Sequence, residues 1–230
     1  MCVHGAGGNR DSWIPLMRNL AGQGVSSLAL ELPGHGESGV AQISDVKEYS
    51  RYVVQFLEAK RLKSVYLTGH SMGGAVALAS VMSHAELLKG VILIGSGAKL
   101  RVKDSILEGV KSDFRKTVDE IIGYAFSPAA DPSLIQEGTR GLLRCNVDTM
   151  HNDFIACDRF DVLSELESIT TPALILCGED DLLTPPKYSQ FMSGKIPNAK
   201  LTIVPQSGHM VMLEQPGVIG GLITQFINEF

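Results

Sequence analysis

The feature that most limits the fold of this chain is the alternation of short apolar runs with longer amphipathic runs. The apolar runs have the length and residue types of buried strands, whereas the runs between them repeat apolar residues at helical spacing. The strand-like runs are 25–32, 64–68, 90–95, 173–177 and 200–204, and the clearest helical repeats lie within 49–57 and 218–230. Because strands joined through helices pair in parallel, the alternation predicts an α/β fold with a mostly parallel sheet and helices on both faces.

One long segment breaks this alternation. Residues 100–168 contain no convincing strand, but apolar residues recur there at helical spacing, as at Val118, Ile121 and Ile122. We therefore expect a helical insertion at 100–168 and a core formed by 1–99 and 169–230. Since α/β proteins bind ligands at the carboxyl ends of their strands, the insertion is expected to cover that edge of the sheet.

A serine between two glycines follows one of the predicted strands. In Gly69-His70-Ser71-Met72-Gly73 the apolar run ends at the first glycine, and an Ala-rich helical run, 75–79, follows the second. A turn from strand to helix within about four residues strains the serine backbone and holds its hydroxyl above the helix N-terminus. The pattern alone also occurs in ordinary glycine-rich turns, but this context makes Ser71 the candidate nucleophile.

A glycine-rich segment at 3–9 suggests the partner of that nucleophile. It lacks the Gly-x-Gly-x-x-Gly spacing of dinucleotide sites and the Lys-Ser/Thr ending of a P-loop. Small residues let a backbone N–H approach a substrate carbonyl closely. We expect the N–H groups of Ala6 and Met72 to form an oxyanion hole, the alternative being a flexible loop without a role.

The acid and the base are expected in two loops that follow predicted strands. Asp180 and Asp181 come shortly after 173–177, and His209 comes after 200–204. Either feature alone is common in solvated loops. Together with Ser71 they stand in the order serine, acid, histidine, and we favour Asp181 over Asp180 as the residue that orients His209.

With these segments the chain resembles the α/β-hydrolase family from Val3 to its C-terminus. The run 31–38, Glu-Leu-Pro-Gly-His-Gly-Glu-Ser, is similar to the family's loop after its fourth strand. The resemblance implies an eight-stranded, mostly parallel sheet, a helical cap at 100–168 and chemistry without a metal or an organic cofactor. It also implies that Ser71 attacks an acyl carbon while His209, held by Asp181, takes the proton.

The chain departs from the family pattern at its start. Family members usually have two strands before the oxyanion loop, whereas only residues 1–4 precede it here. Without those strands, 25–32 becomes a sheet edge with unpaired backbone groups, which invites pairing with another chain. We expect either a homodimer that covers this edge or a chain recorded without its true beginning.

Charge, hydropathy and cysteine spacing exclude several classes. A net charge of −5 provides no basic stripe for nucleic acid. No apolar stretch approaches the roughly 20 residues of a membrane span, and 1–4 has no signal-peptide character. The four cysteines lack metal-binding spacing, so we expect reduced thiols and no metal site in a cytoplasmic protein.

The substrate is less constrained than the chemistry. The insertion offers apolar candidates for a substrate pocket, Phe126, Met150, Phe154 and Ile155, although such residues also pack an insertion onto its core. We expect a carboxylesterase-like hydrolase acting on a small or medium carboxylic ester. The same residues would also serve an enol-lactonase, a carbon–carbon bond hydrolase, a thioesterase or a perhydrolase, and a hydrolase-like small-molecule receptor is a further alternative.

Overall fold

A six-stranded parallel sheet forms the centre of the molecule. The computed structural model describes all residues, 1–230. The strands are β1 (Cys2–Val3), β2 (Ala29–Leu30), β3 (Val65–His70), β4 (Leu88–Ile94), β5 (Ala173–Gly178) and β6 (Ala199–Val204). They lie in the order β2-β1-β3-β4-β5-β6, and every neighbouring pair is parallel. The predicted α/β architecture is confirmed.

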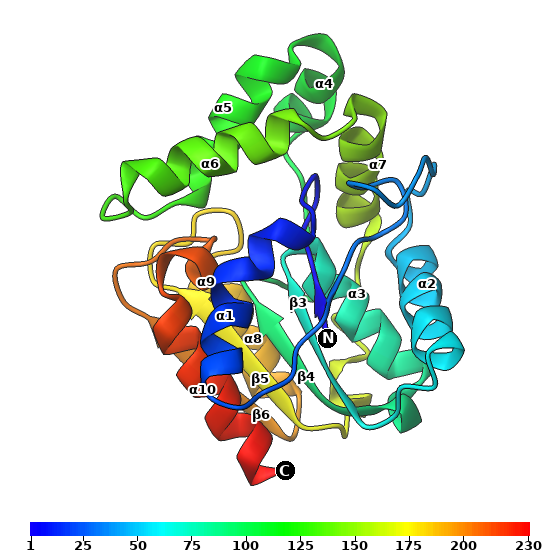
Figure 1. Cartoon of the computed structure of the whole chain (residues 1–230). Coiled ribbons are helices and arrows are strands. Elements are labelled where there is room, and N and C mark those ends of the chain that lie inside the picture. The colour runs from blue at the N-terminus through cyan, green and yellow to red at the C-terminus, as the bar shows by residue number, and fades with distance from the viewer.

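Helices cover both faces of this sheet (Figure 1). They are η1 (Arg10–Trp13), α1 (Ile14–Gly22), α2 (Val46–Ala59), α3 (Met72–Ser83), η2 (Ala85–Leu87), η3 (Leu166–Ser168), α8 (Pro186–Lys195), α9 (Val211–Glu214) and α10 (Pro216–Glu229). α1 and α10 pack on one face, and α2 and α3 pack on the other. The helices that connect the strands therefore form two apolar layers, one on each face of the sheet.

The side-chain period of two explains why both layers are apolar. In β4, Val91 and Leu93 enter the core beneath α2 and α3, whereas Ile92 and Ile94 enter the core beneath α1 and α10. All four are fully buried. A parallel strand covered on both faces needs such a continuous apolar run, because neither set of alternate side chains meets water.

The structure corrects the predicted edge of the sheet. The expected strand 25–32 pairs only at Ala29 and Leu30, because its partner β1 offers only Cys2 and Val3. The sequence reading did not anticipate β1, which lies between β2 and β3. β2 is the outermost strand on this side, as expected for the segment that contains it.

The segment between β4 and β5 forms four helices at the carboxyl ends of the strands (Figure 1). They are α4 (Asp104–Ser112), α5 (Phe114–Ala125), α6 (Pro132–Leu143) and α7 (Val147–Arg159). An antiparallel bridge pairs Lys99, where the chain leaves the core, with Asp161, where it returns to the core. α4 to α6 share a separate apolar cluster, and α7 contributes to both layers: Met150 belongs to that cluster, whereas Ala156 and Cys157 belong to the main core. None of the helices combines the length and the apolar character that a membrane crossing requires.

Candidate active site

Ser71 alone connects β3 to α3. The strand ends at His70, the helix begins at Met72, and Ser71 between them has φ 53° and ψ −118°, a strained backbone for a residue with a side chain. Glycines allow this tight approach: a Cβ on Gly69 would collide with the backbone of Gly73, and a Cβ on Gly73 with the carbonyl of Val3. The turn leaves the Ser71 side chain at the wall of a cavity.

His209 and Asp181 meet across two loops at the same edge of the sheet. Nδ1 of His209 lies 2.9 Å from Oδ2 of Asp181, and both residues are almost fully buried. Because an ionised carboxylate can only accept, Nδ1 carries the proton of this hydrogen bond. Nε2 of neutral His209 is then the acceptor nitrogen, and His209 lines the same cavity as Ser71.

The Asp181 carboxylate is held ionised by its donors. Oδ1 accepts the N–H groups of Leu183 and Thr184 at 2.9 and 2.8 Å, and Oδ2 accepts the Thr184 hydroxyl at 2.8 Å. Burial alone would raise the pKa of Asp181, but His209 and these donors hold it below its usual value. Asp180, the second candidate, instead accepts the Ser127 hydroxyl at 2.7 Å.

His70 fixes the loop that carries His209. Its Nε2 lies 3.0 Å from the carbonyl oxygen of His209, so this nitrogen carries a proton and donates it. The two imidazole rings lie 4.6 Å apart between centroids. Burial, together with the neighbouring His209, lowers the pKa of His70 to about 3, so His70 is a neutral residue that holds this loop beside Ser71.

Two backbone N–H groups close to Ser71 in the chain or the cavity have no partner within the protein: that of Met72, the next residue, and that of Ala6, which lines the cavity. Met72 is the first residue of α3, so its N–H has no partner within the helix. The N–H of Ala6 donates to no other protein atom. Ala6 lies in a turn in which the Gly8 N–H donates to the Gly5 carbonyl at 3.1 Å. Neither N–H group is therefore used by another part of the protein.

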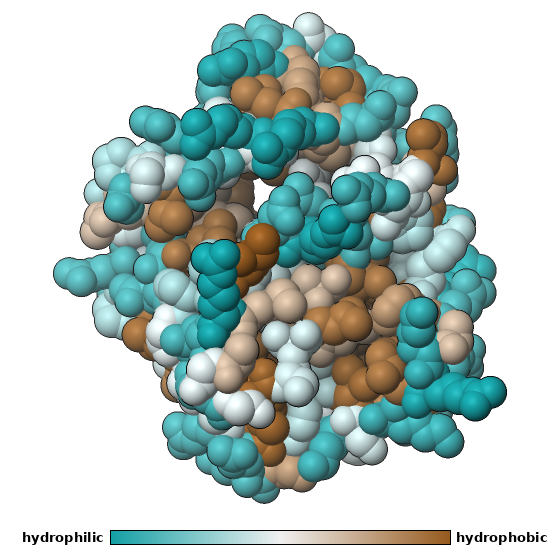
Figure 2. Space-filling model, viewed as in Figure 1, coloured by the Kyte–Doolittle hydropathy of each residue, from teal (hydrophilic) through white to brown (hydrophobic).

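The cavity lies between the core and the helical layer formed by α4 to α7. It has a volume of about 660 Å³, within the usual range for small-molecule sites. Figure 2 shows the molecule hollowed between that layer at the top and the body below it. Its lining includes Ser71, His209 and Leu183, together with apolar residues of α5 and charged residues of α6.

The predicted pocket residues divide into two groups. Phe126 and Phe154 line the cavity, whereas Met150 and Ile155 do not, which corrects the prediction for those two. Met150 is fully buried, and its side chain fills the space beside Gly7. Ile155 is half-buried elsewhere on α7. Helical spacing alone did not distinguish the face of α7 that borders the cavity from its neighbours.

Several residues that shape the site were not anticipated. Thr184 lies three residues after Asp181, and its signal was the short run Leu-Leu-Thr-Pro within the acidic loop. His70 stands inside the serine motif itself. Glu214 accepts the Gly208 and Ser127 N–H groups at 2.9 and 3.0 Å and so ties the His209 loop to the helical layer. No group of three or more His, Cys, Asp or Glu side chains is arranged to hold a metal ion.

Comparison with known proteins adds a family and several named relatives. A family model described as "Alpha/beta hydrolase family" matches residues 1–219. A pimeloyl-[acyl-carrier protein] methyl ester esterase of Neisseria meningitidis serogroup C is 25% identical over 241 aligned positions, covering 98% of this chain and 92% of the relative. An uncharacterised hydrolase of Bacillus subtilis is 29% identical and covers 99% of this chain and 89% of its own length.

Solved structures give the same picture. The structure of a thermophilic esterase is 34% identical and matches 99% of this chain and 88% of its own with a TM-score of 0.89. An esterase from Exiguobacterium antarcticum has a TM-score of 0.92 over 99% of this chain and 91% of its own. Its identity is 20%, so that second likeness concerns the fold.

Proposed function

This chain belongs to the α/β-hydrolase family, and on that premise we propose that it is a serine hydrolase that cleaves small or medium carboxylic esters. The observation that carries the proposal is the placement of a strained Ser71 and a His209–Asp181 pair on one cavity. Such a constellation serves acyl transfer because each residue has a separate task in moving one proton and one acyl group.

The proposed reaction proceeds through an acyl-enzyme. Nε2 of His209 accepts the Ser71 proton as the hydroxyl attacks the ester carbonyl, and Asp181 stabilises the resulting imidazolium. The N–H groups of Ala6 and Met72 stabilise the oxyanion, and removal of one such donor typically costs about 3 kcal/mol of transition-state stabilisation. The alcohol leaves with the proton from His209, and the same histidine then activates water to release the acid.

The relatives support an ester as the substrate class. One is named a methyl ester esterase and another is a thermophilic esterase at 34% identity. The apolar residues of α5 and Phe154 would accommodate an acyl chain in the cavity. In this proposal residues 1–99 and 169–230 carry the reaction, and 100–168 act as a cap that shapes the substrate site.

Covalent labelling combined with turnover tests the proposal. We expect a fluorescent organophosphonate to label the protein at Ser71, and p-nitrophenyl esters to be hydrolysed faster than matched lactones and thioesters. Ser71→Ala should abolish labelling and lower kcat by at least about 10⁴-fold. Ser12→Ala is the matched control, because Ser12 lines the same cavity without a glycine-flanked turn, and it should label normally.

Two outcomes would reject this function. Persistent labelling of Ser71→Ala would remove Ser71 as the nucleophile. A ligand-induced thermal shift in the wild-type protein without turnover of any ester would indicate a receptor.

The exposed edge strand supports a separate proposal about assembly. β2 pairs with β1 on one side only, and its other edge is free to pair with a second copy of the chain. A homodimer through β2 predicts twice the chain mass in light scattering after size-exclusion chromatography. A stable monomer at high concentration would exclude it.

A further inference from the structure

Asp153 of α7 extends from the helical layer to the glycine turn beside Ser71. Its side chain is completely buried. Oδ2 accepts the backbone N–H of Gly7 at 2.8 Å and the Nε2–H of His35 at 2.7 Å, and Oδ1 accepts the Tyr49 hydroxyl at 2.6 Å. One carboxylate therefore joins four segments that are distant in the sequence.

The Gly7 hydrogen bond determines how the turn is oriented. Gly7 follows Ala6 in the Gly5–Gly8 turn and has φ +64°, as the third residue of a type II turn requires. In a trans peptide the N–H and the preceding carbonyl point in opposite directions. Because Asp153 accepts the Gly7 N–H, it also directs the Ala6 carbonyl away from itself. Reversal of this peptide would bring a carbonyl against a buried carboxylate.

His35 can compensate the charge of the buried Asp153 carboxylate. Both ring nitrogens of His35 face acceptors, Asp153 Oδ2 at 2.7 Å and the Pro33 carbonyl at 3.2 Å, so the doubly protonated ring is satisfied. Burial opposes that charge, but the hydrogen bond and the charge of Asp153 raise the pKa of His35 above its usual value. When His35 is protonated it neutralises the Asp153 carboxylate, which can then lie near the site without opposing an oxyanion.

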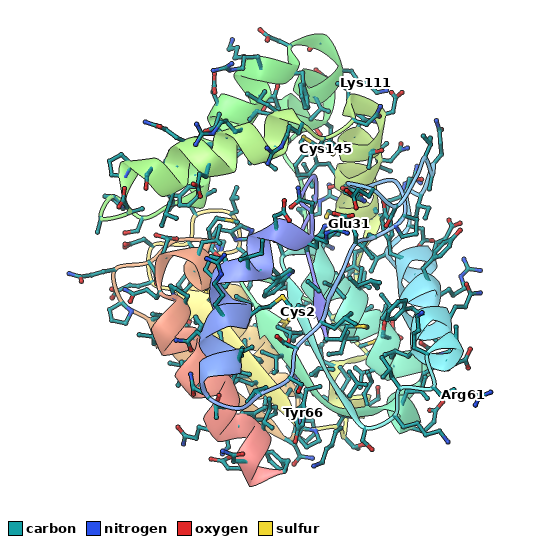
Figure 3. All side chains as sticks on the ribbon, in the orientation of Figure 1. Cys2, Glu31, Arg61, Tyr66, Lys111 and Cys145 are labelled. Atoms are coloured by element: carbon teal, nitrogen blue, oxygen red, sulfur yellow. The ribbon has the colours of Figure 1, made fainter.

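The loop after β2 completes the connection between α7 and the site. Figure 3 labels Glu31 on this loop and Cys145 just before α7. The Thr149 hydroxyl donates to the Gly34 carbonyl at 3.3 Å, so the loop lies against α7. His4, at the start of the glycine turn, packs on His35 with ring centroids 4.7 Å apart. The turn, the loop and α7 are thus one hydrogen-bonded unit.

We propose that Asp153 is a positioning residue for the oxyanion hole, which it holds in shape through the Gly7 N–H. The role rests on the proposed ester hydrolysis, in which Ala6 supplies one of the two donors. It makes α7 a part of the catalytic apparatus as well as a wall of the substrate site. Asp153 itself does not line the cavity, so it acts through the turn and not on the substrate.

The first test compares two aspartates of α7. Asp153→Leu removes the acceptor of the Gly7 N–H, whereas Asp158→Leu removes an acceptor of another backbone N–H, that of Val102, at 3.1 Å. Active-site titration with an organophosphonate normalises kcat to the folded, competent fraction. We expect Asp153→Leu to lower kcat per titrated site on the order of 100-fold with little change in KM, because a small displacement of a transition-state donor has that effect. Asp158→Leu should change kcat per site less than about twofold.

The second test removes the donor and leaves Asp153 in place, in case Asp153→Leu does not fold. An ester replaces the Gly7 amide through incorporation of glycolic acid. The control is the same replacement at Gly24, a left-handed glycine on the surface whose N–H donates to Ala21 at 3.0 Å. We expect a loss of at least about tenfold in kcat per site at Gly7 and none at Gly24.

The outcomes separate this role from the proposed function. Wild-type kcat per site in the Gly7 ester, or in Asp153→Leu with only a lower Tm, would overturn the positioning role and leave ester hydrolysis standing. Failure of the wild-type protein to hydrolyse esters or to label at Ser71 would reject the proposed function instead.

Discussion

The chain contains two buried histidine–aspartate pairs of nearly the same geometry. Nδ1 of His209 lies 2.9 Å from Asp181, and Nε2 of His35 lies 2.7 Å from Asp153. Only the first pair includes a residue that lines the cavity, His209. The second has no exposed side-chain surface and is surrounded by Tyr49, Gly7 and His4.

The difference lies in what the second nitrogen of each histidine meets. In the first pair Nε2 of His209 has no protein acceptor, so the ring can exchange a proton with a hydroxyl on the cavity wall. In the second pair Nδ1 of His35 faces the Pro33 carbonyl, so both nitrogens are occupied. We therefore expect the His209–Asp181 pair, which keeps one nitrogen free, to transfer protons, and the His35–Asp153 pair, which keeps neither free, to stabilise the fold.

The largest expected effect comes from the same substitution in both pairs. Asp181→Asn places an amide where His209 Nδ1 donates, which favours the wrong tautomer, so kcat should fall by about 10⁴-fold. Asp153→Asn can keep its oxygen toward Gly7 and turn its amide toward Tyr49, so kcat per titrated site should fall less than about tenfold. Steady-state kinetics on a p-nitrophenyl ester measures both. Equal losses would remove the distinction between the pairs.

The second expected effect is on stability, and here the substitution in the His35–Asp153 pair should have the larger effect. His35→Asn leaves Asp153 as a buried charge without its counter-charge and should lower the free energy of unfolding by about 3–5 kcal/mol. His209→Asn should cost only about 1 kcal/mol, because Asp181 retains its donors from Leu183 and Thr184. Urea denaturation followed by circular dichroism compares them. A greater loss in His209→Asn would mean that the cavity-facing pair stabilises the fold more.

A smaller effect follows from deleting one hydroxyl donor in each pair. Thr184→Val and Tyr49→Phe each remove a hydrogen bond to the aspartate, worth about 1 kcal/mol. In Thr184→Val this change should appear mainly as a several-fold lower kcat, since Thr184 donates to Asp181, the proposed catalytic acid. In Tyr49→Phe it should appear as a lower Tm with kcat within about twofold, because Tyr49 binds the oxygen that does not hold Gly7. Thermal unfolding and kinetics on the same samples decide, and a kcat loss confined to Tyr49→Phe would contradict the assignment.

The smallest expected effect is that the pairs weaken at opposite ends of the pH scale. The pKa of His35 is raised above 6.5, so its stabilising contribution is complete below that value and is lost as pH rises through the raised pKa. The pKa of Asp181 lies below 3.8, so its contribution is present above that value and is lost as pH falls through the lowered pKa.

Unfolding free energies measured across pH check both signs. The difference between wild type and His35→Asn should shrink toward alkaline pH, and the difference between wild type and Asp181→Asn should shrink toward acid pH. Differences that stay constant with pH would show that neither titration is coupled to folding.

The comparison also explains which parts of the site could be predicted from the sequence. Ser71, Asp181 and His209 each follow a strand, so local pattern and topology were enough to place them at one edge of the sheet. Asp153 and His35 are 118 residues apart, and no local periodicity links them. Long-range polar pairs of this kind depend on how α7 docks, which the helical pattern of 100–168 does not encode.

The fold shows the same limit. The long apolar runs became β4 and β5 with nearly the predicted bounds, because strands buried on both faces have a strong signal. β6 is the outermost strand on its side and is only partly buried, but its apolar run also gave nearly the predicted bounds. β1 was missed, since two residues carry no periodicity, and β2 was predicted too long because its length depends on that partner. Likewise Phe126 and Met150 are both apolar residues of the insertion, and the sequence does not show which of them lines the cavity. Met150 instead packs against Gly7.

The position of α7 between two apolar clusters has a consequence for exchanging parts between related enzymes. Ala156 and Cys157 of α7 pack with the main core, whereas Met150 of α7 belongs to the cluster formed with α4 and α5. The inserted segment leaves the core near Lys99 and returns near Asp161, and the part of it that can be exchanged without altering α7 is 104–143. A chimera that keeps the native α7 should retain a competent oxyanion hole while it acquires the substrate preference of the donor, and one that replaces α7 as well should lose turnover.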